Sequence, residues 1–204
     1  MQLDSNQISG LIGICREQIA RHSDELSELD SAIGDGDHGT NMLRGFEAVF
    51  EARPELAGKP LPQALQDIGM VLVMSVGGAA GPLYGTLLIE LGRGLEKADG
   101  TESFAATLQR AIAAVARRGR SGPGDKTLLD VLYPVHDELS RHATLHEIAR
   151  RAVSAALATQ PMEARRGRAS FLGPRSIGHV DPGAFSCAIL TAAICTYLQE
   201  CTVQ

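Results

Sequence analysis

The chain has 204 residues, of which 44% are hydrophobic and 21% are charged. These values are ordinary for a soluble globular domain and exclude a largely disordered chain. A formal net charge of −5, with five Phe, three Tyr and no Trp, argues against a nucleic-acid-binding protein, which needs a basic surface.

Helical periodicity runs along almost the whole chain. Ser5 can cap a first helix, in which apolar residues from Ile8 to Ile19 recur at three- and four-residue steps, and Ser23 opens a second helix. No segment shows the sustained two-residue alternation of a strand. Seven more helices are expected, over residues 41–52, 62–76, 82–98, 102–118, 127–141, 145–165 and 183–200.

Local signals refine these expected helices. The segment Thr144-Leu-His-Glu147 has the spacing of a capping box at a helix start. Pro134 and Pro161 lack a backbone N–H and should kink or interrupt the helices that contain them. Since there is no internal repeat and no linker that would divide the chain, the sequence predicts one all-α domain spanning residues 1–204.

One uncharged segment, residues 68–89, is long enough to cross a bilayer. Its centre reads Gly77-Gly-Ala-Ala-Gly-Pro82 and would break a spanning helix, so we expect two buried half-helices joined by a glycine turn. The N-terminus has neither a basic region nor an apolar signal core. Four cysteines without a Cys-x-x-Cys pair fit a reduced protein. We therefore expect a cytoplasmic protein that does not enter a membrane.

The segment Asp30-Ser-Ala-Ile-Gly-Asp35-Gly-Asp37 places three carboxylates around two glycines. The glycines can adopt backbone conformations closed to other residues, so the chain can turn all three acids toward a common centre. Carboxylates held close together repel one another unless a cation lies between them. Oxygen ligands without cysteine favour a hard ion such as Mg²⁺. The alternative is a solvated acidic turn, or a helix end at Gly34 followed by a helix N-cap at Asp37.

Charge is distributed unevenly along the chain. Residues 1–37 hold eight acidic and two basic residues, whereas residues 141–175 hold seven arginines and two glutamates. An acidic metal-binding end and a basic end would suit a polyphosphate between them, although charge runs are usually solvated faces. Four glycine-rich loops are candidates for close backbone approach to a ligand, the alternative for each being a plain helix C-cap. They span residues 34–39, 77–85, 119–126 and 167–183.

Five motifs follow one another along the chain. They are Asp30-x4-Asp35-Gly-Asp37-His38-Gly-x-Asn41, Gly77-Gly-Ala-Ala-Gly-Pro-Leu-Tyr-Gly-Thr86, Pro123-Gly-Asp-Lys-Thr127, Gly167-Arg-Ala-Ser170 and Arg175-Ser-Ile-Gly-His-Val-Asp-Pro-Gly183. In this order they resemble the nucleotide-binding L subunit of dihydroxyacetone kinases, and the likeness extends from about residue 3 to residue 200. The resemblance implies an antiparallel eight-helix barrel with the nucleotide in loops at one end. It also implies a cytoplasmic phosphotransferase that holds ADP or ATP through two Mg²⁺ ions.

The resemblance also implies a role for individual residues. The implied Mg²⁺ ligands are Asp30, Asp35 and Asp37. The implied nucleotide-binding residues are His38, Gly39, Thr40, Asn41, Ala79, Ala80, Gly119, Leu128, Arg168, Asp181, Pro182 and Gly183. Arg168 matches a phosphate-contacting arginine and is expected to be catalytic, because its planar guanidinium can hold two oxygens and stabilise the transferring phosphoryl group.

Some positions depart from the family pattern or lack a match in it. Ala80 replaces the serine of the usual Gly-Gly-Ala-Ser-Gly, which removes a hydroxyl donor, but the loop N–H groups can still bind phosphate. For Leu128, a role in the core is an alternative almost as strong as a role beside the nucleotide. Arg165, Arg166 and Arg175 have no correspondence, and we interpret them as solvated or as docking residues for an acidic partner.

The resemblance implies the ADP- or ATP-binding subunit of a phosphoenolpyruvate-dependent dihydroxyacetone kinase. In that family branch a separate K subunit holds dihydroxyacetone on a histidine, and the L subunit transfers the phosphoryl group. A phosphohistidine on a phosphotransferase-system M subunit then rephosphorylates the bound ADP in place. One alternative is an ATP-exchanging kinase for dihydroxyacetone or another short ketose such as erythrulose. Another is a nucleotide-loaded regulatory module that binds a transcription factor.

Overall fold

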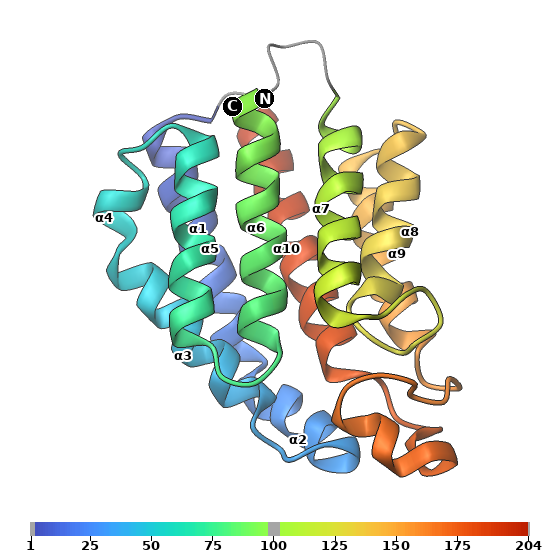
Figure 1. Ribbon diagram of the computed structural model, residues 1–204. Coiled ribbons are helices and arrows are strands. Elements are labelled where there is room, and N and C mark those ends of the chain that lie inside the picture. Colours follow the sequence, from blue (N-terminus) through green and yellow to red (C-terminus); the bar gives the residue numbers. More distant parts are fainter. Residues whose placement is uncertain (1–2, 98–102, 204) are drawn as a thin grey trace.

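The computed structural model describes residues 3–97 and 103–203, which form helices and no strand (Figure 1). The longer helices are α1 (Ser5–Arg21), α3 (His38–Glu51), α5 (Leu61–Ser75), α6 (Ala80–Lys97), α7 (Phe104–Gly119), α8 (Leu129–Ser140), α9 (Leu145–Leu157) and α10 (Pro182–Val203). The shorter elements are α2 (Ser23–Ile33), α4 (Arg53–Leu56) and the 3₁₀ helix η1 (Arg168–Ser176). The prediction of an all-α chain is confirmed.

Contacts between the longer helices close a ring in the described part of the chain. α1 packs against α3, and α3 packs against α5. From α5 to α10 each of these helices packs against the next one in the chain, and α10 returns to α1. Figure 1 shows α5, α6 and α7 side by side, with α10 behind them. The regular antiparallel barrel remains a prediction from the family resemblance.

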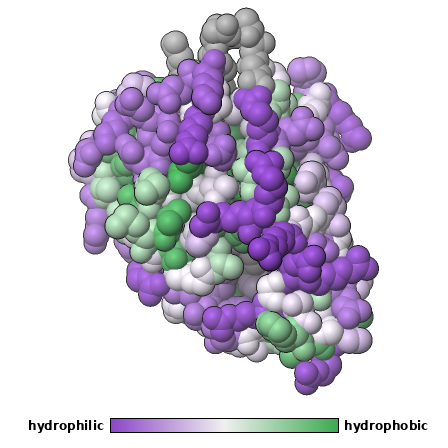
Figure 2. All heavy atoms as spheres, viewed as in Figure 1, coloured by the Kyte–Doolittle hydropathy of each residue, from purple (hydrophilic) through white to green (hydrophobic). Residues whose placement is uncertain are grey.

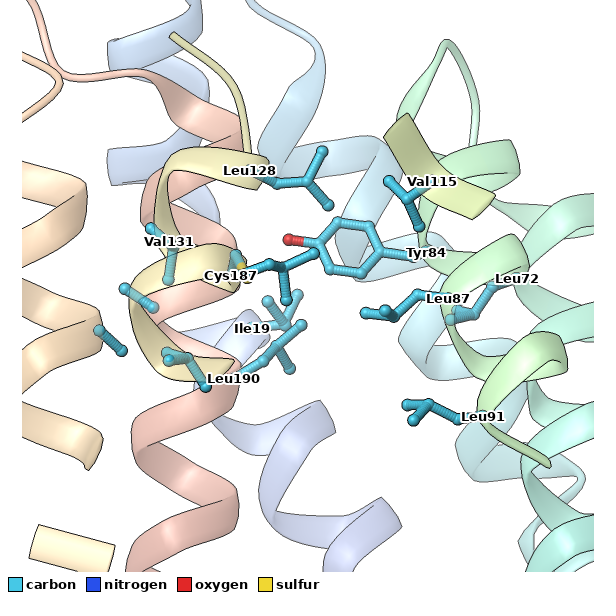
Figure 3. Close-up of a cluster of buried hydrophobic side chains, with 14 of the residues drawn as sticks. Ile19, Leu72, Tyr84, Leu87, Leu91, Val115, Leu128, Val131, Cys187 and Leu190 are labelled. Carbon is cyan, nitrogen blue, oxygen red and sulfur yellow. The ribbon is translucent and has the colours of Figure 1, made fainter. Parts of the chain in front are cut away.

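The hydrophobic core lies inside this ring. Ile19, Leu26 and Leu72 are completely buried. Figure 3 shows side chains of α6, including Tyr84, pointing across the interior toward Cys187 on α10. An apolar cavity of about 240 Å³ remains among the core side chains of α1, α5, α6 and α10. The core therefore occupies the middle of the ring and leaves the helix ends free to carry polar groups.

The uncharged segment 68–89 folds back on itself, as predicted from its glycines. α5 and α6 approach so closely that a Cβ on Gly69 would lie 2.8 Å from the backbone O of Gly85. Among the described residues, the helix long and apolar enough to cross a membrane is instead α10, over Pro182–Cys201. A core helix of a soluble protein can meet the same criteria of length and composition; 39% of the apolar window of α10 is buried, and α10 packs against α1, α8 and α9.

Several predicted helix ends are wrong. Asp4, and not Ser5, caps α1, because its side chain accepts a hydrogen bond from the N–H of Gln7 at 2.8 Å. α3 begins at His38 and not at residue 41. α8 continues through Pro134 without a break. The predicted end at residue 98 and the predicted start at residue 102 lie outside the described residues.

The largest difference concerns the expected helix over residues 145–165. The capping box at Thr144 is confirmed, since its hydroxyl accepts the N–H of Glu147 and the Glu147 carboxylate accepts the N–H of Thr144. However, α9 ends at Leu157, and η1 follows over residues 168–176. After α9, backbone groups form hydrogen bonds with residues distant in the sequence. For example, the N–H of Gly178 donates to the carbonyl of Gln160 at 2.8 Å.

Candidate functional site

Loops from five parts of the chain meet at one end of the ring, the lower end in Figure 1. They surround a pocket of about 170 Å³. The lining segments are residues 30–41, 77–80, 126–128, 166–169 and 181–183, together with Leu83 and Tyr84 from the first turns of α6. The glycine-rich loops that the sequence singled out therefore contribute to one site, with residues 119–126 reaching it through Lys126.

Three helices begin at this pocket. α3 begins at His38, α6 at Ala80 and α10 at Pro182. The first N–H groups of a helix have no partner inside the helix, and the helix dipole places partial positive charge at the same end. Three helix N-termini at one pocket favour an anionic ligand, such as one that carries phosphate groups.

The acidic turn, residues 30–41, is folded by its own backbone. One Asp30 oxygen accepts the N–H of Asp37 at 2.9 Å and that of His38 at 3.1 Å. Gly36 has a φ of +78°, which L side chains rarely adopt. A Cβ on Gly34 would lie 2.2 Å from an Asp30 carboxylate oxygen, so glycine makes room for this acid.

The three acids of this turn fit a divalent cation. One oxygen from each of Asp30, Asp35 and Asp37 lies within 4.8 Å of the others. A helix does end at Gly34 and Asp37 does occupy an N-cap position, but its side chain makes no capping hydrogen bond. The Asp37 carboxylate is therefore not used as a cap. Hard oxygen donors with room for phosphate oxygens suit Mg²⁺.

Arg168 lines the same pocket and forms an ion pair with Asp35, one of these acids. The Arg168 side chain is 64% exposed and the Asp35 side chain 35% exposed. Exposed ion pairs contribute little to stability, so this pair can be exchanged for other partners at small cost. A guanidinium can hold two oxygens of one phosphate.

His38 is held by a short chain of hydrogen bonds. Its Nε2 lies 2.9 Å from the Ser186 hydroxyl, which lies 2.8 Å from the Tyr84 hydroxyl. Burial lowers the pKa of His38, and the nearby Asp30 and Asp37 carboxylates oppose this only in part. The imidazole is therefore neutral at neutral pH, with its ring orientation fixed from α6 and α10.

Asp181 and Lys126 are two buried ionisable residues that line the pocket. The Asp181 carboxylate accepts the N–H of Ala184 at 2.7 Å, which caps α10. Burial raises the pKa of Asp181 to about 7. The hydrogen bond from the Ala184 N–H lowers this pKa, the nearby Asp130 carboxylate raises it, and the positive charge of Lys126 lowers it. Burial lowers the pKa of Lys126, and the nearby Asp181 raises it by a smaller amount.

We call residues 162–176, which include η1, the arginine lobe. It carries Arg165, Arg166, Arg168 and Arg175, all exposed. Figure 2 shows hydrophobic atoms on its surface, where Phe171 is 87% exposed. The lobe faces the acidic turn across the pocket and supplies Arg166, Gly167 and Arg168 to its lining.

The pocket gathers most of the residues that the sequence singled out. The lining includes Asp30, Asp35, Asp37, His38, Asn41, Ala79, Ala80, Leu128, Arg168, Asp181, Pro182 and Gly183. Gly39, Thr40 and Gly119 are not in this lining. A Cβ on Gly39 would lie 1.8 Å from the backbone O of Ser23, so this glycine allows α2 and α3 to pack closely. The Thr40 hydroxyl donates to the Asp37 carbonyl, and Gly119 ends α7, where a Cβ would lie 3.4 Å from the side chain of the pocket residue Leu83.

Other lining residues were not singled out from the sequence as ligand contacts. They are Ile33, Gly77, Gly78, Leu83, Tyr84, Lys126, Thr127, Arg166, Gly167 and Ala169. Arg166, interpreted as a solvated or docking residue, lies at the pocket because its Nε donates to the Arg120 carbonyl at 2.5 Å. Lys126 and Thr127 belong to the motif ending at Thr127, which was a usable signal. The burial of Lys126 could not be predicted from its residue type.

Comparisons with known proteins agree with this geometry. The DAK2 domain family matches residues 32–196. The Escherichia coli (strain K12) protein named PEP-dependent dihydroxyacetone kinase, ADP-binding subunit DhaL, is 40% identical over 91% of this chain and 93% of its own length. A Listeria innocua protein named as the ADP-binding subunit DhaL of PEP-dependent dihydroxyacetone kinase 1 is 37% identical over 87% of this chain and 89% of its own.

The chain therefore belongs to the DhaL family of dihydroxyacetone kinase subunits. The crystal structure of the C. freundii dihydroxyacetone kinase in complex with AMP-PNP and Mg²⁺ matches with a TM-score of 0.78 at 21% identity. That match covers 96% of this chain and 34% of the C. freundii chain. At this identity it establishes a shared fold.

Proposed function

We propose that the chain is the ADP-binding subunit of a phosphoenolpyruvate-dependent dihydroxyacetone kinase. It transfers a phosphoryl group from a Mg-bound nucleotide to dihydroxyacetone held on a separate K subunit. The observation that carries this proposal is the pocket in which three carboxylates within 4.8 Å of one another face Arg168. The names of the E. coli and Listeria relatives support it.

In this proposal the acidic turn holds the metal. Asp30, Asp35 and Asp37 would hold two Mg²⁺ ions, which would supply neutralisation of the charge on the phosphate oxygens. The Asp30 carboxylate also fixes the turn through the N–H groups of Asp37 and His38, so its position is set before any ligand arrives. Preorganised ligands reduce the cost of binding.

The nucleotide lies between the acidic turn and the arginine lobe. Backbone N–H groups at Ala79 and Ala80 bind phosphate oxygens at the start of α6, which compensates in part for the missing serine hydroxyl at residue 80. Leu83 and Leu128 form an apolar wall suited to the base. Asp181 shapes the turn that approaches the nucleotide from α10.

Arg168 performs the catalytic role. Its guanidinium, which pairs with Asp35 in this structure, would hold oxygens of the transferring phosphoryl group. Phosphoryl transfer depends on positioning and on neutralising charge in the transition state, and a guanidinium at the transferring group supplies both. His38 stays neutral and contacts the nucleotide with its ring held by Ser186.

The subunit works in the cytoplasm with two partners. After transfer to dihydroxyacetone on the K subunit, the retained ADP is rephosphorylated in place by a phosphohistidine on the M subunit. ADP is then a cofactor, and loops from five segments that close around one ligand suit its retention. A transcription factor as a further partner would use the same nucleotide-loaded form.

Retention of ADP is the test. Radiolabelled ADP is loaded on the protein, and its exchange with excess unlabelled ADP is compared with the turnover rate. We expect exchange to be far slower than one turnover, while K subunit plus phosphorylated M subunit phosphorylates the bound label in place. Exchange within one turnover, with free ATP alone sustaining the reaction, would instead establish an ATP-exchanging kinase.

A further inference from the structure

Lys126 is the largest side chain that is fully buried among the described residues, with 1% of its surface exposed. Its ammonium donates to the carbonyl of Met162 at 3.0 Å and to the carbonyl of Ser176 at 2.5 Å. A buried ammonium is costly unless it is hydrogen-bonded, and here two backbone carbonyls provide the partners. The side chain is therefore committed to two points of the backbone.

Those two carbonyls are the two ends of the arginine lobe. Lys126 thus holds Met162, where the lobe begins, and Ser176, where it ends. Because Lys126 lies in the loop before α8, both ends of the lobe are fixed to that loop. Two further bonds reinforce the same base: the N–H of Ala164 donates to the Ser176 hydroxyl, and the N–H of Arg165 donates to the Asp125 carbonyl.

Apolar packing holds the lobe only weakly. Its buried residues Ala164 and Ala169 join Ile33 of α2 and the half-buried Leu172 in a small cluster separate from the main core. Such a cluster buries little apolar surface and leaves the orientation of the lobe to polar contacts. The bonds from Lys126, together with the bond between Ala164 and Ser176, tie the two ends of the lobe to each other.

The backbone of Lys126 adopts a conformation that favours glycine. Its φ is +62°, in the left-handed region that glycine adopts freely. Two residues earlier, Gly124 has a φ of +84°. A lysine in this strained conformation persists where surrounding contacts over-determine it, and such residues cluster at functional sites.

We infer that Lys126 is a positioning residue for phosphoryl transfer: by tying both ends of the arginine lobe, it sets the place of Arg168 over the pocket. This inference rests on the proposed function for its kinetic consequence, but not for its structural one. Lys126 acts through Arg168 and does not touch the transferring group. Loss of the tether should therefore lower the transfer rate more than it lowers nucleotide affinity.

The first measurement is limited trypsin digestion, since the lobe carries four arginines. In Lys126→Met, which keeps most of the length of the side chain but removes the ammonium, cleavage at these arginines should be about tenfold faster than in the wild type. The sites are read by intact-mass spectrometry, and circular dichroism checks that the helices remain. Lys59→Met is the matched control, because Lys59 bonds Glu55 and Asp67 far from the lobe.

The second measurement is single-turnover transfer from loaded Mg-ATP to dihydroxyacetone on the K subunit. Lys126→Met should be slower by about tenfold or more, with the Mg-ADP dissociation constant changed less than about threefold. The double variant with Arg168→Lys should be about as slow as Arg168→Lys alone, because both changes remove the same contribution.

The outcomes separate cleanly. Unchanged trypsin cleavage overturns the tether, and multiplied rate losses in the double variant show that Lys126 does not act through Arg168. If the wild type does not bind Mg-ADP, the proposed function fails while digestion still tests the tether. Lys126→Gln, whose amide can reach one carbonyl, should give intermediate cleavage and serves if Lys126→Met does not fold.

Discussion

The acidic turn and the arginine lobe face each other across the pocket, but they are held in different ways. In the turn, Asp30 bonds the N–H groups of residues seven and eight positions further along the chain. In the lobe, Lys126 bonds carbonyls 36 and 50 positions away. One half of the site is therefore encoded locally, and the other half depends on the completed fold.

This difference predicts different responses to change. A substitution in the turn removes a ligand or its immediate support, whereas most of the fold remains. A substitution at the base of the lobe leaves every predicted ligand in the chain but changes where Arg168 lies. Substitutions in the acidic turn should mainly change the affinity for Mg-ADP, and substitutions at the base of the arginine lobe should mainly change the rate of phosphoryl transfer.

The largest effect is expected from removing one acid of the turn. Asp35→Asn or Asp37→Asn should weaken Mg-ADP binding by about ten- to hundredfold, in line with about 1.5–3 kcal/mol for a charged interaction. Calorimetric titration measures this, and Asp24→Asn on the exposed surface of α2 is the control. Wild-type affinity in both variants would remove the metal assignment.

Gly39→Ala tests whether the turn and the packing of α2 on α3 form one unit. The new Cβ would meet the Ser23 carbonyl at 1.8 Å, so the free energy of unfolding should fall by about 1–3 kcal/mol. Urea unfolding measures the loss. Gly13→Ala on α1, where a Cβ meets nothing within 4 Å, should be neutral or stabilising by up to about 1 kcal/mol. A Gly39→Ala protein of wild-type stability and weakened ADP binding would support the direct ligand role predicted for Gly39 instead of a packing role.

Arg168→Lys probes the lobe itself. It keeps the charge but loses the planar fork, so the transfer rate should fall by about tenfold or more, and nucleotide affinity should fall less. Single-turnover transfer to dihydroxyacetone on the K subunit measures the rate. Arg175→Lys, at the other end of the same lobe, should transfer normally. Equal rates for wild type and Arg168→Lys would make Arg168 a surface residue.

The smallest effect is expected at the capping box of α9, the helix that leads toward the lobe. The N–H of Thr144, and then its hydroxyl, lower the pKa of Glu147 by bonding its charged form. This stabilisation is present above the ordinary Glu pKa and is lost as pH falls through the lowered folded pKa. Glu147→Gln should therefore melt slightly earlier than the wild type at pH 7 and together with it at pH 3. A melting difference that persists at pH 3 would show that charge is not the cause.

The sequence by itself determined the features that depend on near neighbours. The all-α class follows from three- and four-residue apolar spacing, and the capping box follows from Thr144 and Glu147. The acidic turn follows from glycines that allow its backbone and acids that would repel without a cation. Each of these rests on contacts within about one or two helical turns, where residue type and spacing fix the geometry.

Only the tertiary structure decided the features that depend on distant partners. The end of α9 at Leu157, the η1 helix and the place of Arg166 all follow from bonds to other parts of the chain. Gly39 has a motif position near the nucleotide, yet its missing side chain makes room for the Ser23 carbonyl. Lys126 belongs to the motif that ends at Thr127, but its burial follows only from the fold, because the folded chain brings two carbonyls to its ammonium. Neither burial nor long-range hydrogen bonding is a property of residue type, since both arise only when the whole chain has packed.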